Sequence, residues 1–245
     1  MHKMVRKIFL LAGKHKTGTT SVQNYLDRNE AFLNRHGIAI VRNTVFAAGT
    51  PGVAPKTNCF LLAHMMIRGT LLTPVRLRGY SPEESYDDQC ANARTANRLL
   101  RGIPGQRLII SAEALSFLRT ARERHVYDMV FGGFEVCPIV CFRKPRAWMA
   151  SWKKQVHDLR ETHGRLVETP GSIFDFSENS WLVDDAAIRG FFGPDTCALS
   201  YEDEIEKYQS VIPAIMNKLG FSLPDCPSWD DVWDNRSRGS KPLTG

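Results

Sequence analysis

The sequence predicts a single α/β domain in which a central parallel sheet is covered by helices on both faces. The chain of 245 residues has an ordinary globular composition, with 43% apolar and 24% charged residues, and α/β folds commonly reach this length undivided. Apolar runs of strand length alternate with stretches of helical periodicity, which is typical of parallel sheets. Residues 1–245 are therefore interpreted as one domain.

The first strand, loop and helix lie at the N-terminus. Apolar residues 7–12 predict a buried strand, and the glycine-containing residues 13–18 predict a tight loop. Apolar side chains at helical spacing over residues 22–33 then predict a helix that ends at Gly37. Residues 38–41 predict a second, short strand.

A segment of weak periodicity follows. Residues 43–80 are rich in Gly, Pro, Thr and Arg, and we interpret them as an irregular insertion or lid. Ser81 then provides a hydroxyl cap, Pro82 the first helical position and Glu84 the third. These residues predict a helix that starts there and runs to about Leu100.

The remaining elements continue the alternation. Strands are predicted at residues 107–111 and 136–142, and Pro138 suggests that pairing of the latter begins after it. A helix that follows carries Trp148 and Trp152, one turn apart.

The C-terminal part predicts one more strand and one more helix. Residues 197–201 read as a short strand. A helix over about residues 205–219 is expected to end at Gly220.

Charge and cysteine content restrict the partners and the compartment. The formal net charge of +6 favours anionic partners, which include nucleotides, acidic sugars, nucleic acids and anionic membrane surfaces. The six cysteines contain no CxxC pair, so we expect buried thiols in a reducing compartment and neither disulfides nor a zinc site.

The N-terminus imitates a signal peptide, because basic residues precede an apolar run. That run is short and leads into charged residues without a small-residue cleavage site, so a buried strand fits better. Apolar stretches of the roughly 20 residues that a membrane span needs are missing from the sequence. We therefore expect a cytoplasmic protein without a membrane anchor.

The loop between the first strand and helix has the chemistry of an anion site. It reads GKHKTGTTS from Gly13, and free N–H groups and the positive dipole end of the helix favour an anion there. The nucleotide-triphosphatase pattern G-x-x-x-x-G-K-[ST] matches at Gly13 and Gly18, but Thr19 stands where its lysine should be. The lysine lies inside the loop instead, at Lys16.

That displaced lysine carries a family resemblance. The segment KTGTT, residues 16–20, resembles the 5′-phosphosulfate loop of the sulfotransferases that use 3′-phosphoadenosine 5′-phosphosulfate (PAPS), in which K-[ST]-G-T-T follows the first strand. The resemblance implies a P-loop-like sulfotransferase fold of the soluble, bacterial type. It also implies that the loop binds the 5′-phosphosulfate through these residues: Lys16, Thr17, Gly18, Thr19 and Thr20.

A second segment resembles the same family. The run CFRKPRAWMASWKKQ places Arg143 at a strand end and Ser151 eight residues later on the next helix. A guanidinium with a nearby hydroxyl forms a forked phosphate site. In this family, a segment of the form R-[DN]-P-x-x-x-x-x-S binds the 3′-phosphate, and Lys144 departs from its usual Asp or Asn.

Two shorter matches follow. The segment LSYED resembles the family's Y-E-D segment, whose tyrosine lies beside the adenine, and this implies that Tyr201 stacks on the base. The alternative is a tyrosine packed at a strand end. The segment NRSRG resembles the C-terminal loop over the 3′-phosphate and implies contacts from Ser237 and Arg238, while a solvated basic tail explains it equally well.

The resemblance implies in-line sulfuryl transfer without a metal ion. Lys16 would neutralise charge on the bridging oxygen of the leaving 3′,5′-diphosphate. Glu113 follows a predicted strand at the sheet edge where α/β proteins bind ligands, so it is the candidate base. A helix-end carboxylate is the alternative for Glu113, and His15 is the competing base.

Other functions remain open at this level. A nucleotide-dependent kinase is the alternative enzyme, although an apolar run ending in a magnesium-binding Asp is missing from the sequence. A basic nucleic-acid or glycan-binding module is the alternative without catalysis.

The acceptor is expected to be a small molecule or a carbohydrate with a hydroxyl or amine. Basic residues of the 43–80 segment hint at an acidic acceptor, although a solvated loop explains them equally well: His64, Arg68, Arg76 and Arg78.

Overall fold

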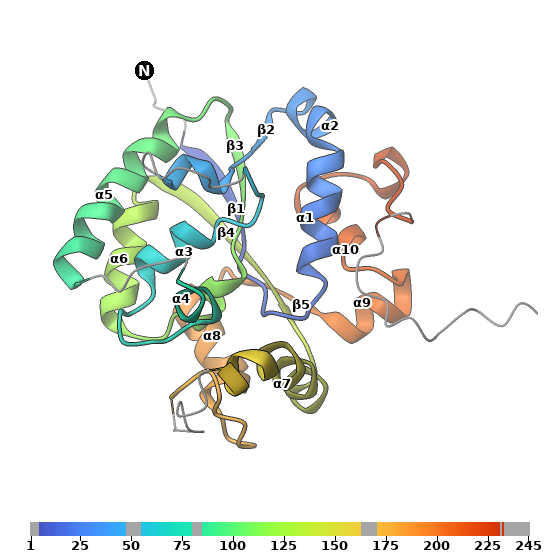
Figure 1. Ribbon diagram of the computed structural model, residues 1–245. Coiled ribbons are helices and arrows are strands. Elements are labelled where there is room, and N and C mark those ends of the chain that lie inside the picture. Colours follow the sequence, from blue (N-terminus) through green and yellow to red (C-terminus); the bar gives the residue numbers. More distant parts are fainter. Residues whose placement is uncertain (1–4, 48–54, 80–84, 163–170, 231, 233–245) are drawn as a thin grey trace, which may run out of the picture.

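The computed structural model describes residues 5–47, 55–79, 85–162, 171–230 and 232. They form an α/β domain around a five-stranded sheet in which every pair of neighbouring strands is parallel (Figure 1). The strand order is β2-β3-β1-β4-β5. The strands are β1 (Arg6–Leu11), β2 (Ile38–Ile40), β3 (Arg107–Ser111), β4 (Phe134–Phe142) and β5 (Cys197–Ser200). The predicted fold class is therefore confirmed.

Helices cover both faces of the sheet (Figure 1). The α-helices are α1 (Thr19–Arg28), α2 (Glu30–Arg35), α3 (Phe60–Met66), α4 (Pro74–Leu77), α5 (Tyr86–Gly102), α6 (Ala121–Phe131), α7 (Pro145–Thr162), α8 (Asp185–Phe192), α9 (Tyr201–Tyr208) and α10 (Ile212–Lys218). Short 3-10 helices are η1 (Asn43–Phe46), η2 (Glu113–Phe117), η3 (Trp181–Val183) and η4 (Leu223–Asp225).

Alternate side chains of the strands enter two separate cores. On one face, Ile8 and Leu10 of β1 pack in a cluster with residues of α3, α5, α6, α7 and α8. On the other face, Phe9 and Leu11 pack in a cluster with residues of α1, α2 and α10. This alternation follows from the two-residue period of a strand and explains why the strand sequences are apolar throughout.

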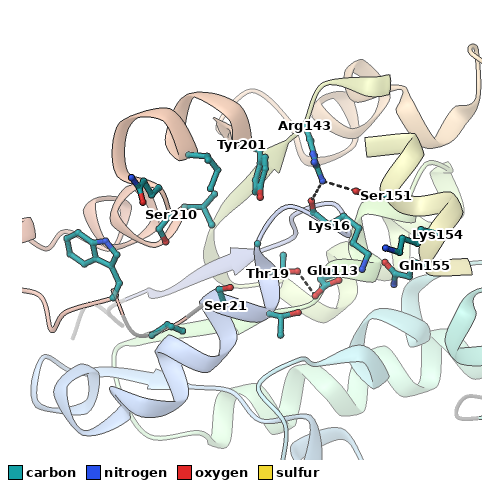
Figure 2. A pocket seen from close by; sticks show the side chains of 17 residues that line it. Lys16, Thr19, Ser21, Glu113, Arg143, Ser151, Lys154, Gln155, Tyr201 and Ser210 are labelled. Atoms are coloured by element: carbon teal, nitrogen blue, oxygen red, sulfur yellow. Dashed lines mark hydrogen bonds between the residues drawn. The ribbon is translucent and has the colours of Figure 1, made fainter. Parts of the chain in front are cut away.

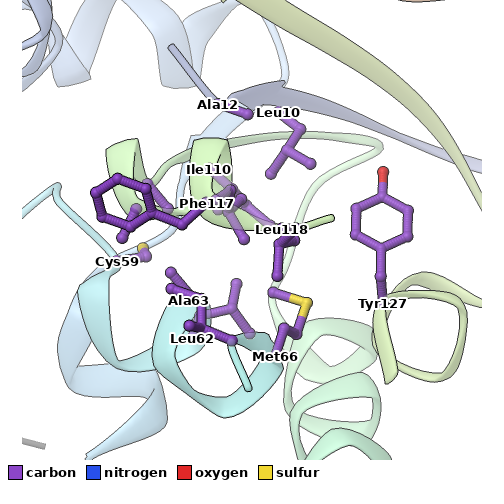
Figure 3. Close-up of a cluster of buried hydrophobic side chains, with 14 of the residues drawn as sticks. Leu10, Ala12, Cys59, Leu62, Ala63, Met66, Ile110, Phe117, Leu118 and Tyr127 are labelled. Carbon is purple, nitrogen blue, oxygen red and sulfur yellow. The ribbon is translucent and has the colours of Figure 1, made fainter. Parts of the chain in front are cut away.

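The segment of residues 43–80 contains more regular structure than its sequence suggests. Helix α3 lies within it, and Figure 3 shows its Leu62 and Met66 in the same core as Ile110 of β3 and Phe117 of η2. The isolated bridge between Asn58 and Ser111 also ties the segment to the sheet. Its described parts therefore belong to the body of the domain.

Strand β4 runs through Pro138, so the expectation that pairing begins after this proline is wrong. Pro138 is in register with Leu10 of β1, while pairing with β5 begins only at Ile139. The carbonyl of Ile139 accepts a hydrogen bond from Ala12 N, just beyond the end of β1. Because successive residues of a strand direct their backbone groups to opposite neighbours, the backbone nitrogen and carbonyl of Pro138 face the β5 side. Because β5 has not yet begun there, the missing N–H of the proline costs no ladder hydrogen bond.

Three helix boundaries differ from the sequence prediction. Helix α5 begins at Tyr86, because the Ser85 side chain accepts a hydrogen bond from Asp88 N and caps it, while the predicted start at residues 81–84 lies outside the described residues. The first predicted helix is divided at Asn29, whose side chain donates to the carbonyl of Tyr25 at 2.9 Å.

The predicted C-terminal helix is also divided, into α9 and α10. Gln209 ends α9 with a left-handed φ of 55°. Pro213 lies in the first turn of α10 and has no N–H to donate to the carbonyl of Gln209, so a continuous helix is disfavoured. The preceding strand ends at Ser200, which makes Tyr201 the first residue of α9 instead of a strand residue.

Two further sequence expectations can be compared with the structure. All six cysteines are free thiols, but only Cys59 and Cys141 are buried, and the other four are partly exposed. Within the described ranges, a helix with the length and apolar character needed to cross a membrane is not found.

Candidate nucleotide-binding and catalytic site

The candidate site lies where the carboxyl ends of the parallel strands meet. The loop with Lys16 follows β1, Glu113 follows β3, Arg143 follows β4 and Tyr201 follows β5. Strands β2 and β3 lie on one side of β1, and β4 and β5 lie on the other, so the direction in which strands are added to the sheet reverses at β1. Ligands of open α/β sheets bind at this kind of switch point.

The loop after β1 presents the N-terminus of α1 to the pocket. Lys16 and Gly18 both adopt left-handed backbone conformations, with φ of 65° and 80°. A Cβ atom on Gly18 would lie 3.1 Å from Val211 Cγ2, so this position requires glycine for both conformation and space. The N–H groups of the first turn of α1 have no acceptor within the helix and are available to an anion.

The loop is held in place by hydrogen bonds and by an ion pair between Lys14 and Asp185, neither of which was a sequence candidate. The Thr17 hydroxyl donates to Lys14 O at 2.6 Å, and Trp148 Nε1 of α7 donates to His15 O at 2.6 Å. Lys14 is buried and forms an ion pair with Asp185 of α8 at 2.9 Å. Burial lowers the pKa of Lys14 below its usual value, and the Asp185 carboxylate opposes this only in part.

Arg143 connects three parts of the site (Figure 2). Its Nη1 donates to Lys16 O and to Ser151 Oγ, both at 3.1 Å. Its guanidinium lies 4.9 Å from the ring centroid of Tyr201, and its Nε lies 3.8 Å from Glu202 Oε1. The predicted pair of Arg143 and Ser151 is thus in direct contact and lies against the loop after β1.

Glu113 is the carboxylate nearest to the loop. Its Oε1 accepts from the Thr19 hydroxyl at 2.5 Å, and its Oε2 lies 2.7 Å from His15 Nδ1. Burial alone would raise the pKa of Glu113, but His15, Thr19 and Lys16 together outweigh it and hold this pKa below its usual value. From the sequence alone, partial burial would be expected to raise the pKa of this carboxyl, and the structure contradicts that expectation. Because the ionised carboxylate only accepts, His15 Nδ1 is the donor.

His15 supports Glu113 from outside the pocket. Its ring packs against Phe117 and Trp152, with centroid distances of 5.4 and 5.1 Å. His15 Nε2 is buried and finds no hydrogen-bond partner among the described residues. Glu113 lines the pocket and His15 is not among the lining residues, so the geometry favours Glu113 as the group that meets a ligand.

These residues surround a pocket of about 730 Å³, within the range of small-molecule sites. Its wall combines the loop after β1, the first turn of α1, the exposed face of α7, helix α9 and the C-terminal segment. The lining residues are Lys16, Gly18, Thr19, Thr20, Ser21, Glu113, Arg143, Ser151, Lys154, Gln155, Tyr201, Ile205, Gln209, Ser210, Val211, Trp229 and Val232.

Several lining residues were missed by the sequence analysis. Lys154 and Gln155 follow Ser151 at spacings of three and four on α7, and this helical spacing was a usable signal. Trp229 and Val232 reach the pocket because the C-terminal segment folds back along α1, where Tyr25 Oη donates to Pro227 O at 2.9 Å. Nothing local in the sequence indicates this return.

Other sequence candidates lie elsewhere. Thr17 is buried beneath the loop and does not line the pocket. Ser237 and Arg238 lie outside the described residues. Among the described residues, His, Cys, Asp and Glu side chains do not form groups of three that would hold a metal ion.

The basic residues that hinted at an acidic acceptor have structural contacts. Arg76 is buried and donates to five backbone carbonyls, including those of His64 and Leu71. Arg68 pairs with Glu123 at 3.1 Å. His64 is bonded to Phe60 O and Thr73 Oγ1, and burial lowers its pKa to about 4. These three residues thus have contacts within the fold and do not line the pocket described above, and Arg78 is exposed.

Comparisons with known proteins identify the fold. Neither a protein-family model nor a curated protein matches the sequence. The structure is similar to the crystal structure of a sulfotransferase from Alicyclobacillus acidocaldarius, with a TM-score of 0.53 and 15% sequence identity over 94% of this chain and 86% of that chain. The chain therefore has a sulfotransferase-like fold, with a single parallel α/β sheet flanked by helices.

Proposed function

We propose that this protein is a sulfotransferase that moves the sulfuryl group of PAPS to a hydroxyl or amine of an acceptor. One observation carries the proposal: two cofactor motifs 127 residues apart in sequence meet at one pocket, where Arg143 Nη1 donates to Lys16 O at 3.1 Å. Taken alone, each motif is also compatible with a purely structural role, as an ordinary strand-to-helix turn or as a surface arginine with a helix serine. Their contact at the ligand-binding edge of a sulfotransferase-like fold is expected if both hold the same nucleotide.

In this proposal, each part of the sulfuryl donor PAPS has a place in the pocket. The 5′-phosphosulfate lies at the N-terminus of α1, where backbone N–H groups and Lys16 meet its negative charge. The 3′-phosphate lies on Arg143 and Ser151. The adenine ring lies toward Tyr201 and Trp229, which supply aromatic surface at the other side of the pocket.

The reaction is an in-line displacement at sulfur. The acceptor oxygen forms a bond to the sulfur, and the bond from that sulfur to the bridging oxygen of the 5′-phosphate breaks. Lys16 neutralises the charge that develops on this bridging oxygen. Glu113, which is ionised and lines the pocket, takes the proton of the acceptor hydroxyl, and His15 holds the carboxylate in place.

Thermal unfolding with two nucleotides tests the proposal. Adenosine 3′,5′-diphosphate at about 100 times its dissociation constant should stabilise the protein by about 2.7 kcal/mol. For a chain of this length, we expect the melting temperature to rise by about 5–10 °C. ATP with magnesium at the same concentration should produce a much smaller shift.

The same experiment separates the alternatives. A larger shift with ATP and magnesium would support a kinase and contradict the proposal. No shift with either nucleotide, combined with a shift on adding an acidic oligosaccharide or nucleic acid, would support a binding module without this chemistry.

Arg143→Ala tests the place of the 3′-phosphate. Hydrogen bonds to charged groups contribute about 1.5–3 kcal/mol, so the variant should narrow the affinity gap between adenosine 3′,5′-diphosphate and AMP by about tenfold or more. Calorimetric titration of both nucleotides measures this gap. Arg146→Ala is the matched control, because Arg146 is an exposed arginine of α7 that does not line the pocket. An unchanged gap in Arg143→Ala would place the 3′-phosphate elsewhere.

A further inference from the structure

The two ends of the pocket differ in chemistry. Among the described residues, the apolar or aromatic lining comes from α9, the segment after it and the C-terminal segment: Tyr201, Ile205, Val211, Trp229 and Val232. At the other end, Figure 2 shows Lys154 and Gln155 on the same side as Lys16 and Glu113, away from Ser210. The described residues that line that end are polar. A ligand that fills the whole pocket therefore has an apolar, flat part and a polar part.

The polar end is where an acceptor must enter. Lys16 and Glu113 flank the place of the reacting group in the proposed function, and in-line attack requires the acceptor to approach opposite the leaving oxygen. The nucleoside occupies the side with Tyr201 and Trp229. The remainder of the acceptor then lies against the residues beyond Glu113, which are Lys154 and Gln155 of α7.

Helix α7 connects the donor and the acceptor ends. Ser151, Lys154 and Gln155 have spacings of three and four, which places them on one face of the helix. Ser151 contacts Arg143 at 3.1 Å and belongs to the donor side. Lys154 and Gln155 lie one turn further along the same face and line the same pocket.

Among the described residues that line the pocket, Lys154 is the cation that remains for the acceptor. Arg143 is held by Ser151, the carbonyl of Lys16 and the Tyr201 ring. Lys16 serves the sulfuryl group in the proposed function. Lys154 lines the pocket and forms neither an ion pair nor a hydrogen bond with the part of the chain that the structure describes, whereas the adjacent Lys153 lies over the Phe176 ring at 5.2 Å.

We infer that the acceptor is a polyhydroxylated molecule, such as a sugar, that carries a carboxylate or sulfate group, and that Lys154 binds this anionic group. The inference rests on the proposed function. Gln155 offers both an N–H donor and a carbonyl acceptor, which suits neighbouring hydroxyls. The described residues at this end are polar, which favours a hydrophilic acceptor over a hydrophobic phenol or sterol.

Binding of two glycosides that differ in one carboxylate tests the inference. The probes are p-nitrophenyl β-D-glucuronide and p-nitrophenyl β-D-glucoside, titrated calorimetrically into protein saturated with adenosine 3′,5′-diphosphate. An exposed ion pair reaches about 1 kcal/mol, which is about fivefold in affinity. We therefore expect the glucuronide to bind about fivefold tighter than the glucoside, with a preference that decreases as salt is added.

Variants of adjacent lysines assign the preference to one residue. Lys154→Gln should bring the two affinities to within about twofold, and Lys154→Glu should reverse the preference. Lys153→Gln is the matched control and should leave the fivefold gap intact, because Lys153 does not line the pocket. Neither Lys154 variant should alter the affinity for the diphosphate.

Each other outcome overturns part of the account. Equal binding of the glycosides, or no binding of either to the diphosphate-loaded protein, would overturn the inference alone. If Lys154→Gln weakens diphosphate binding and leaves the glycoside gap unchanged, Lys154 belongs to the donor site and the inference is wrong. If the wild-type protein does not bind the diphosphate, the proposed function itself fails.

Discussion

Lys16→Ala is expected to abolish most sulfuryl transfer while adenosine 3′,5′-diphosphate binding stays largely intact. The reason is that Lys16 stabilises the charge that develops on the bridging oxygen as the bond to sulfur breaks, whereas binding of the 5′-phosphate is shared with the backbone N–H groups of the loop and of α1. Removing one such stabilising group typically costs about 10²–10³ in kcat. The measurement is kcat from release of the diphosphate, paired with a calorimetric dissociation constant for that product.

The backbone of the loop makes this variant a clean test. Lys16 adopts a φ of 65°, and its carbonyl accepts from Arg143 at 3.1 Å. Alanine has the same backbone preferences as lysine, so the carbonyl contact is retained and only the ammonium group is lost. Turnover within threefold of wild type would show that Lys16 does not stabilise the transition state. An equal loss of turnover and of diphosphate affinity would show that it acts in binding.

Glu113→Gln should lower kcat by about 10²–10⁴, the usual contribution of a general base. The amide has nearly the same shape and keeps an oxygen that accepts from Thr19, so the affinity for the diphosphate should change little. Glutamine cannot take a proton from the acceptor. Steady-state kinetics with saturating donor and acceptor measure the loss, and calorimetry with the diphosphate is the control.

The pH dependence of the rate follows from the lowered pKa of Glu113. A base must be deprotonated, and this carboxyl loses its proton below the usual glutamate range, so the rate should stay level as pH falls from neutral into the mildly acidic range. It should decline only when the pH approaches the lowered pKa. An acidic limb near neutral pH would report another group.

His15→Ala separates the two base candidates. If Glu113 is the base, the loss of His15 should reduce kcat less than Glu113→Gln, and the acidic limb should move to higher pH because a group that lowers the pKa of Glu113 is gone. If His15 is the base, His15→Ala should carry the large loss and Glu113→Gln a small one. Loss of diphosphate binding in Glu113→Gln would make Glu113 a donor-side or structural residue.

Local features of the sequence were sufficient for the sheet and the donor loop. Strand β3 lies at the predicted residues 107–111, because an apolar run bounded by turn residues needs no distant information. The loop with Lys16 was placed between strand and helix for the same reason. Ser85, which caps α5, was not singled out, because Ser81 offers the same hydroxyl and the sequence pattern does not decide between the two.

Properties that depend on residues far away in the sequence could not be predicted from local sequence patterns. The burial of Lys14 depends on Asp185, which is 171 residues away. The lowered pKa of Glu113 depends on His15 and Thr19, which reach it from the loop after β1. Arg76 lies in a stretch rich in Gly, Pro, Thr and Arg, yet it is buried on backbone carbonyls that only the fold brings together.

A crystal structure with adenosine 3′,5′-diphosphate bound tests the central claim most directly. We expect the 5′-phosphate at the N-terminus of α1 beside Lys16, and the 3′-phosphate within hydrogen-bonding distance of both Arg143 and Ser151. The adenine ring should lie on the side of Tyr201 and Trp229. The side chains of Glu113 and Lys154 should remain accessible to an acceptor. A nucleotide bound outside this pocket, or one whose 3′-phosphate avoids both Arg143 and Ser151, would contradict the account.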